Sequence, residues 1–351
     1  MTSTRSRSSA RSFGFRLEAG AGIGMGHFMR CYALAQTCRR LGHAATFLSA
    51  GDHATLRSRL TTARVGAVKL TAGHPDPADI EETVHWARGK SAAWLVVDGY
   101  QFDAEYQKRL REAGCRFVAI DDDAHAERYY ADVVLNQNIF SERLHYRFEG
   151  RPLFLRGLRY ALIREEVLVH RRARRPTARR ARRLLVTFGG TDPRRQTLKV
   201  VEALHGVVAD LEVRVVLGPG VVAGEDLRAS LEAHGASRSI VVLRDPDLAS
   251  LMAWADLAIS AAGSTCWELA CLGVPAIVIA VADNQRDIAR GLEEAGLGKN
   301  LGWWESVMPG DITAAVAALV DDAAARREMS RRGRALVDGG GAERVLSALL
   351  N

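Results

Sequence analysis

The apolar and polar positions along the chain follow two patterns in turn, one typical of strands and one typical of helices. Short apolar runs with strand character, such as "FGFRLEA", "AATFLSA", "AAWLVVDGY" and "RFVAIDDD", are separated in the first half by segments with helical spacing of apolar residues, including 28–43 and 103–114. Gly42 follows the first of these helical segments and is a typical helix stop. Strands that alternate with helices indicate parallel pairing through helical crossovers. We therefore predict a doubly wound α/β domain.

The same alternation of predicted strands and helices occurs again after the middle of the chain. The runs "RRLLVTFGGTDP", "LEVRVVLG", "IVVLRD", "LAISAAG" and "PAIVIAVADNQ" are again separated by helical patterns. A chain of 351 residues also exceeds the usual size of one hydrophobic core. We predict two Rossmann-like α/β domains, residues 13–164 and 183–351, joined by an arginine-rich linker at 165–182.

The net charge of +7 has a local origin. Much of the excess lies in the first residues and in "RRARRPTARRARR", residues 171–183. No aromatic residues are interleaved with these arginines, as base stacking would need. The pattern is typical of a solvated linker or helix face, so we expect no nucleic-acid partner.

Cysteines and hydropathy predict the compartment. The five cysteines form no CxxC pair or metal-ligand spacing, which favours a reducing environment. The Ser- and Arg-rich first twelve residues lack a hydrophobic stretch, and the longest apolar run is broken by Gly273 and Pro275. We expect a cytoplasmic monomer that does not insert into membranes.

Three predicted strands end in small-residue loops that lead into helices: "AGAGIGMGH", "FGGTDP" and "SAAGST". Helix amino termini offer free N–H groups to phosphate, and glycine lets phosphate approach the main chain. The dinucleotide fingerprint fails, because its third glycine would fall at His27, and no GxxxxGK[ST] occurs. The loops fit a nucleoside diphosphate held between two domains, although tight turns also use glycine. The loop residues proposed to bind it are Gly24, Gly26, Gly189, Gly190, Thr191, Gly263, Ser264 and Thr265.

His27 lies where the first glycine loop enters a helix. The positive end of the helix dipole disfavours the imidazolium, and a neutral imidazole can accept a proton. A capping or packed histidine is the structural alternative. The position at the mouth of a glycine loop favours a general base.

Carboxylates near the loops permit two interpretations each. Glu268 follows Ser264 by four residues and can reach a ribose hydroxyl, but Thr265 and Glu268 also have the spacing of a capping box. Asp192 before Pro193 fits a helix cap. Asp121, Asp122 and Asp123 alternate in direction and have no obvious histidine partner, so we expect neither a metal nor a cofactor.

A set of motifs in order along the chain resembles one family. "GIGMGHFMRC", "VVDGY", "IDDDAH", "NQN", "YALIREE", "FGGTDP", "SAAGSTCWE" and "VADNQ" are similar to the UDP-2,4-diacetamido-2,4,6-trideoxy-beta-L-altropyranose hydrolases of pseudaminic acid biosynthesis. The resemblance runs from Phe13 to about Gly298. The arginine-rich extension and linker are not part of it.

The resemblance implies a GT-B architecture, two Rossmann-like domains that face each other across a cleft. It implies that UDP binds chiefly to the C-terminal half, with Ser264 and Thr265 near the phosphates and Glu268 on the ribose. It also implies that His27 is the general base. Asp98, Tyr100 and Asn284 match family positions close to the sugar and the reacting centre.

The implied reaction is the release of UDP from a UDP-linked diacetamido trideoxy sugar. Water, deprotonated by His27, would attack the anomeric C1 with inversion. The nearest alternative is a GT-B glycosyltransferase that passes a UDP-amino sugar to an acceptor hydroxyl, or a hydrolase of a related nucleotide sugar. A non-catalytic sugar-nucleotide sensor would need the phosphate loops and Glu268 but not His27.

Overall fold

The protein is described from a computed structural model. It describes residues 10–18, 25–51, 56–172, 176–192, 194–221, 224–233 and 239–351. Gly24, one of the predicted phosphate-binding residues, and Pro193 lie outside the described residues.

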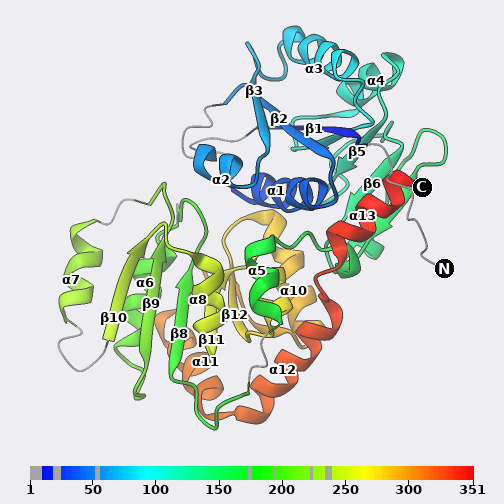
Figure 1. Cartoon of the computed structure of the whole chain (residues 1–351). Coiled ribbons are helices and arrows are strands. Elements are labelled where there is room, and N and C mark those ends of the chain that lie inside the picture. The colour runs from blue at the N-terminus through cyan, green and yellow to red at the C-terminus, as the bar shows by residue number, and fades with distance from the viewer. Residues whose placement is uncertain are drawn as a thin grey trace, which may run out of the picture.

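The N-terminal domain contains a seven-stranded parallel sheet with the order β3-β2-β1-β4-β5-β6-β7 (Figure 1). Its strands are β1 (Ser12–Leu17), β2 (Ala44–Ser49), β3 (Gly66–Lys69), β4 (Trp94–Asp98), β5 (Phe117–Ile120), β6 (Val133–Asn136) and β7 (Leu153–Arg156). Its helices are α1 (Met25–Arg40), α2 (Arg57–Thr62), α3 (Pro77–Gly89) and α4 (Ala104–Glu112). The strands are almost fully apolar because helices cover both faces of a parallel sheet.

The C-terminal domain repeats this design with a six-stranded parallel sheet of order β10-β9-β8-β11-β12-β13. Its strands are β8 (Arg183–Thr187), β9 (Glu212–Leu217), β10 (Ser239–Arg244), β11 (Leu257–Ala261), β12 (Ala276–Ala280) and β13 (Gly298–Trp303). The later helices are α5 (Glu165–Arg171), α6 (Gln196–Leu204), α7 (Glu225–Ala233), α8 (Leu248–Trp254), α9 (Thr265–Leu272), α10 (Arg286–Glu294), α11 (Pro309–Asp321), α12 (Ala323–Leu336) and α13 (Gly341–Leu350). The predicted doubly wound pair of domains is confirmed.

The order of the strands in each sheet indicates where a ligand would bind. β1 pairs with both β2 and β4, and β8 pairs with both β9 and β11, so the strand order reverses at these two strands. Open α/β sheets bind ligands at the carboxyl ends of strands beside such a reversal. Helix α1 follows β1, the Gly189–Gly190 turn follows β8, and α9 follows β11.

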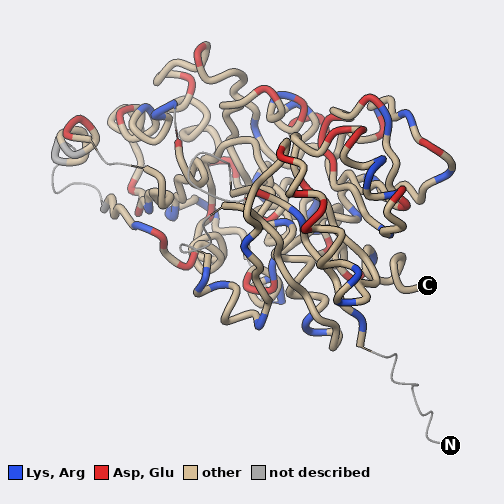
Figure 2. Tube along the Cα trace, turned by 90° about the horizontal axis from the view of Figure 1, so that it is seen from above, with Lys and Arg blue, Asp and Glu red and all other residues tan. Residues whose placement is uncertain are grey.

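Basic residues and acidic residues are both distributed along the chain throughout the molecule (Figure 2). Among the described residues, no helix combines the length and the apolar character that a membrane crossing requires. All five cysteines are free.

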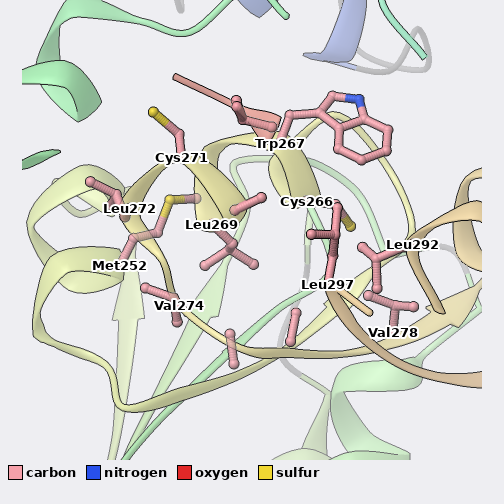
Figure 3. Packing of buried hydrophobic residues seen from close by; sticks show 14 of the residues in the cluster. Met252, Cys266, Trp267, Leu269, Cys271, Leu272, Val274, Val278, Leu292 and Leu297 are labelled. Carbon is pink, nitrogen blue, oxygen red and sulfur yellow. The ribbon is translucent and has the colours of Figure 1, made fainter. Parts of the chain in front are cut away.

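Helix α9 is buried within the C-terminal core. Figure 3 shows its residues Trp267, Leu269 and Leu272 among other apolar side chains, including Met252 and Val278. Trp267 is 1% exposed and Leu269 is fully buried. This packing fixes the amino end of α9, which carries Ser264 and Thr265, relative to the sheet.

The last helix, α13, lies with the N-terminal domain (Figure 1). Its residues Ala342, Val345, Leu346 and Leu349 belong to the same buried cluster as β1 and α1. The indole nitrogen of Trp94 on β4 donates to the carbonyl of Leu349 at 2.8 Å. The predicted range 183–351 for the second domain therefore includes a helix that completes the core of the first.

Candidate active site

One cavity of about 120 Å³ lies between the two domains. The first domain contributes Met25, Gly26 and Met29 from the start of α1, and the second contributes loops after β8, β9 and β11. The predicted residues that line it are Gly26, Gly189, Gly190, Ser264, Thr265 and Glu268. Ligand pockets usually measure ~300–1,000 Å³, so a ligand of that size would extend beyond this cavity.

Glycines in this cavity allow the loops to approach each other closely. A side-chain carbon added at Gly218 would lie 2.2 Å from the carbonyl oxygen of Gly189, and one at Gly190 would lie 2.9 Å from Cγ of Met25. Gly189 also has a φ of +83°, which glycine adopts readily. Gly218 was missed from the sequence, because "LGPG" reads as an ordinary turn.

The amino end of α9 points into the cavity. Ser264 occupies the N-cap position, but its side chain makes no capping hydrogen bond, so its hydroxyl is available to a ligand. A side-chain carbon added at Gly26 would lie only 3.8 Å from Oγ of Ser264. Thr191 and Gly263 are next to lining residues but do not line the cavity themselves.

Glu268 is held by an ion pair. Its two carboxylate oxygens accept hydrogen bonds from Nε and Nη2 of Arg164 at 2.6 and 2.8 Å, and both residues are buried and line the cavity. The capping-box alternative for Glu268 is wrong, because its carboxylate is directed to Arg164. Asp192 does cap a helix, since its carboxylate accepts from the amides of Gln196 and Thr197 at the start of α6.

His27 lies in the first turn of α1, beside Asp98 at the carboxyl end of β4. Nδ1 of His27 is 2.6 Å from Oδ1 of Asp98. A proton on Nδ1 donated to this carboxylate leaves a lone pair on Nε2. Asp98 is 1% exposed, and the contact aligns the imidazole as a carboxylate aligns the histidine of a catalytic dyad.

Arg30, one turn further along α1, ties two carboxylates together. It donates to both oxygens of Asp98 at 2.6 and 2.7 Å, and to both oxygens of Asp122 at 2.7 Å. Burial opposes ionisation of Asp98, but the charge of Arg30 and the hydrogen bonds from Arg30 and His27 outweigh it and hold the pKa of Asp98 well below its ordinary value. Asp98 is therefore a permanent anion next to the imidazole.

Tyr100 and Asn284 meet across the cleft. Nδ2 of Asn284, which follows β12, donates to the Tyr100 hydroxyl at 2.8 Å, and this hydroxyl donates to Asp122 at 3.2 Å. The Tyr100 ring lies edge-on to His27, with 5.1 Å between centroids. Burial and the charge of Asp122 raise the pKa of Tyr100, so the phenol remains protonated. The four predicted catalytic residues thus form one connected group.

Asp121, the first residue of the acidic run 121–123, belongs to a second hydrogen-bond network. Asp121 accepts from the hydroxyls of Tyr129 and Tyr146 at 2.7 Å and pairs with His125. His125 is the histidine partner that the sequence analysis did not find. Within the described residues, ligand atoms of Asp121, Asp123 and His125 lie within 4.8 Å of one another, so these three could hold a metal ion. Hydrogen bonds already engage both oxygens of Asp121.

Sequence reasoning missed the residues that hold the candidate catalytic groups. Arg30 sits among apolar residues at helical spacing, and nothing local shows that it contacts Asp98 and Asp122. Arg164 is part of the motif "YALIREE", but nothing in that motif indicates its contact with Glu268. The arginine in each case is buried, 5% exposed, which is unusual without a paired carboxylate.

Comparisons with known proteins agree with the two-domain fold. Residues 184–339 match the model of the glycosyltransferase family 28 C-terminal domain. Among solved structures, MurG of Acinetobacter baumannii superposes with a TM-score of 0.67 at 15% identity, covering 97% of this chain and 99% of that one. CalG4, the calicheamicin glycosyltransferase, superposes with a TM-score of 0.64 at 16% identity, covering 98% and 99%. The chain has the GT-B glycosyltransferase fold.

Two relatives are similar in sequence. The chain is 25% identical over 339 residues to the spore coat polysaccharide biosynthesis protein SpsG of Bacillus subtilis. The alignment covers 96% of this chain and 97% of that protein. It is 26% identical over 272 residues to the protein MJ1062 of Methanocaldococcus jannaschii, covering 76% of this chain. The alignment spans about half of that relative, 54% of its length.

Proposed function

We propose that the protein is an enzyme of polysaccharide biosynthesis that breaks the anomeric bond of a UDP-activated amino sugar and transfers the glycosyl group to an acceptor hydroxyl. The observation that carries the proposal is the pairing of Asp98 with His27, directly after Gly26, which lines the same cavity as the amino end of α9 and Glu268. The similarity to SpsG and to the glycosyltransferase family 28 C-terminal domain supports transfer.

In this reaction Nε2 of His27 takes the proton of the attacking hydroxyl. The hydroxyl oxygen forms a bond to C1 as the bond from C1 to the diphosphate oxygen breaks, and UDP leaves with the electron pair. A single displacement of this kind inverts the configuration at C1. Asp98 keeps Nδ1 protonated and stabilises the positive charge that develops on the ring.

The C-terminal domain would bind the nucleotide. N–H groups at the start of α9 and the hydroxyls of Ser264 and Thr265 would donate to the diphosphate. Glu268, oriented by Arg164, would accept from a ribose hydroxyl. Charge that develops on the leaving UDP would be stabilised by these fixed dipoles.

Hydrolysis is the second candidate, in which water replaces the acceptor. The motif set from "GIGMGHFMRC" to "VADNQ" favours it, because this set resembles UDP-sugar hydrolases of pseudaminic acid biosynthesis. The substrate would then be UDP-2,4-diacetamido-2,4,6-trideoxy-beta-L-altropyranose. Both candidates use the same groups, and only the nucleophile differs.

The test is UDP release from that sugar nucleotide and from UDP-N-acetylglucosamine, with no acceptor and with a panel of sugar and lipid-linked acceptors. Release that needs an acceptor establishes transfer. Rapid release without one, with free sugar formed in equal amount, establishes hydrolysis. Release of neither kind, together with no binding of UDP by calorimetry, would refute a nucleotide-sugar enzyme.

A further inference from the structure

The arginine-rich segment between the domains is not used by the proposed reaction, yet the structure gives part of it a fixed place. Residues 176–183, here called the strap, lie at the amino-terminal end of the second sheet and include the first residue of β8. The carbonyl of Ala178 accepts from Arg326 at 2.6 Å, and the amide of Ala181 donates to Val320 at 2.9 Å. Ala181 is buried in the C-terminal core. The main chain of this part of the segment is therefore anchored to the second domain, whereas its arginine side chains are exposed.

Three of the four guanidinium groups of the strap form no ion pair with the described residues. Arg180 pairs with Asp321 at 2.8 Å. Asp256 accepts from the main-chain amides of Arg182 and Arg183, so the backbone, not their side chains, engages this carboxylate. Arg179, Arg182 and Arg183 are exposed, and within the described ranges no carboxylate forms an ion pair with them.

These side chains line a groove of about 1,000 Å³. Its charged lining consists of Arg179, Arg180, Arg182 and Arg183 against Asp256 and Asp321. The rest of the lining is largely apolar and comes from Pro176, Ala178, Ala253 and Trp254. The groove is therefore both cationic and apolar.

We propose that this groove binds an extended acidic segment of a partner protein, in which carboxylates alternate with apolar side chains. Arginine is suited to carboxylates, because its planar fork forms paired hydrogen bonds with them. The apolar lining would receive the intervening side chains. A uniform chain of phosphates would leave that lining without a partner.

Two other anionic partners fit less well. Bases of single-stranded nucleic acid need free aromatic faces, but the guanidinium of Arg214 already lies over the Trp254 ring, 4.1 Å from its centroid. A flat lipid surface cannot reach the floor of a concave groove. The shape and lining therefore favour a peptide.

The groove lies away from the candidate active site. The strap leads into the amino end of β8, whereas the Gly189–Gly190 turn follows its carboxyl end. A strand of this length spans ~17 Å. Partner binding would therefore leave the nucleotide cavity open, and it does not depend on which glycosyl reaction the enzyme carries out.

The experiment measures binding of a fluorescent ten-residue peptide of alternating Glu and Leu to the full chain by anisotropy. Arg182→Glu/Arg183→Glu should weaken binding at least tenfold, and binding should weaken as salt is raised. Arg147→Glu/Arg151→Glu, on the N-terminal domain, changes the net charge equally and should leave binding unchanged. Trp254→Ala should weaken binding several-fold, since it removes part of the apolar lining. Thermal melts and UDP affinity should match wild type in both double variants.

Three results would overturn the proposal. One is equal binding of the same peptide with Gln in place of Glu. Another is equal weakening by the control variant, which would show only a response to net charge. The third is tighter, strap-dependent binding of a ten-nucleotide single strand or of vesicles that contain phosphatidylglycerol, which would assign the groove to nucleic acid or to membrane.

Discussion

Two buried arginines in the N-terminal domain have similar partners but different surroundings. Arg16 on β1 is fully buried, donates to Asp79 at 2.8 Å and to the carbonyl of Leu17 at 2.9 Å, and contacts Glu18. Arg30 on α1 is 5% exposed and joins Asp98 to Asp122. A buried ion pair by itself therefore does not identify a functional site.

The difference lies in what each cluster presents to the cleft. Asp79 also accepts from Tyr106, a buried residue, and on its other side the Arg16 cluster reaches Glu18, whose side chain is 14% exposed and accepts from the Ser49 hydroxyl. The Arg30 cluster ends in His27, whose side chain is 15% exposed, and in Tyr100, which is 39% exposed. Exposure alone therefore does not separate the two clusters. The Arg30 cluster differs because the groups it holds in place include an imidazole, which can accept a proton near neutral pH.

Replacing His27 with alanine should have the largest effect on catalysis. A general base usually contributes 10²–10⁴-fold, so turnover should fall by about this factor while UDP affinity changes little. UDP release and calorimetry measure the two quantities. His85→Ala, an exposed histidine on α3, serves as the control and should change neither. An equal loss of affinity and turnover would make His27 a binding residue.

Replacing each buried arginine with methionine tests the comparison directly. Arg30→Met and Arg16→Met should each lower the free energy of unfolding by ~3–5 kcal/mol, because each leaves buried carboxylates without a cation. At a temperature where both variants are folded, only Arg30→Met should lower kcat. Urea unfolding and UDP-release assays provide the measurements. A similar loss of kcat in both variants would mean that stability, not position, explains the effect.

Glu268→Gln should weaken nucleotide binding and alter sugar discrimination. A hydrogen bond to a charged group contributes about 1.5–3 kcal/mol, so affinity for UDP should fall roughly 10- to 100-fold. Wild type should prefer UDP over 2′-deoxy-UDP or 3′-deoxy-UDP, and the variant should lose that preference. Calorimetry on both proteins with all three ligands tests this. Equal losses for every ligand would place Glu268 away from the ribose.

The smallest expected effect is a change in thermal stability with pH that comes from the pair of His125 and Asp121. Burial disfavours the charged imidazole of His125, but Asp121 outweighs it and raises the pKa of His125 above its ordinary value of 6.5. The pair should stabilise the fold fully below pH 6.5 and lose this contribution as pH rises through the raised pKa. The Tm difference between wild type and His125→Gln should therefore shrink by a few degrees between pH 6 and pH 9. A constant difference would exclude this titration.

Local patterns in the sequence predicted the sheets and the loops. Parallel strands put their carboxyl ends at one edge of a sheet, so "FGGTDP" and "SAAGST", which follow two strands of the same sheet, were predicted to lie close together. Contacts between distant segments were not predictable in this way. Arg30 meets partners 68 and 92 positions away, and Arg164 meets Glu268 across 104 positions. These pairs form because the fold buries both partners together, and the local spacing of apolar residues does not show which residues will be buried together.

The crossing of α13 back to the first domain has a consequence for how the chain is made. Ribosomes add ~5–20 residues per second, so the apolar surface beneath α13 waits roughly 10–40 s after residue 164 before its covering helix is synthesised. During that interval the first domain exposes side chains of β1, α1 and Trp94 that the finished protein conceals. The core of the N-terminal domain can therefore be completed only after α13 has been synthesised.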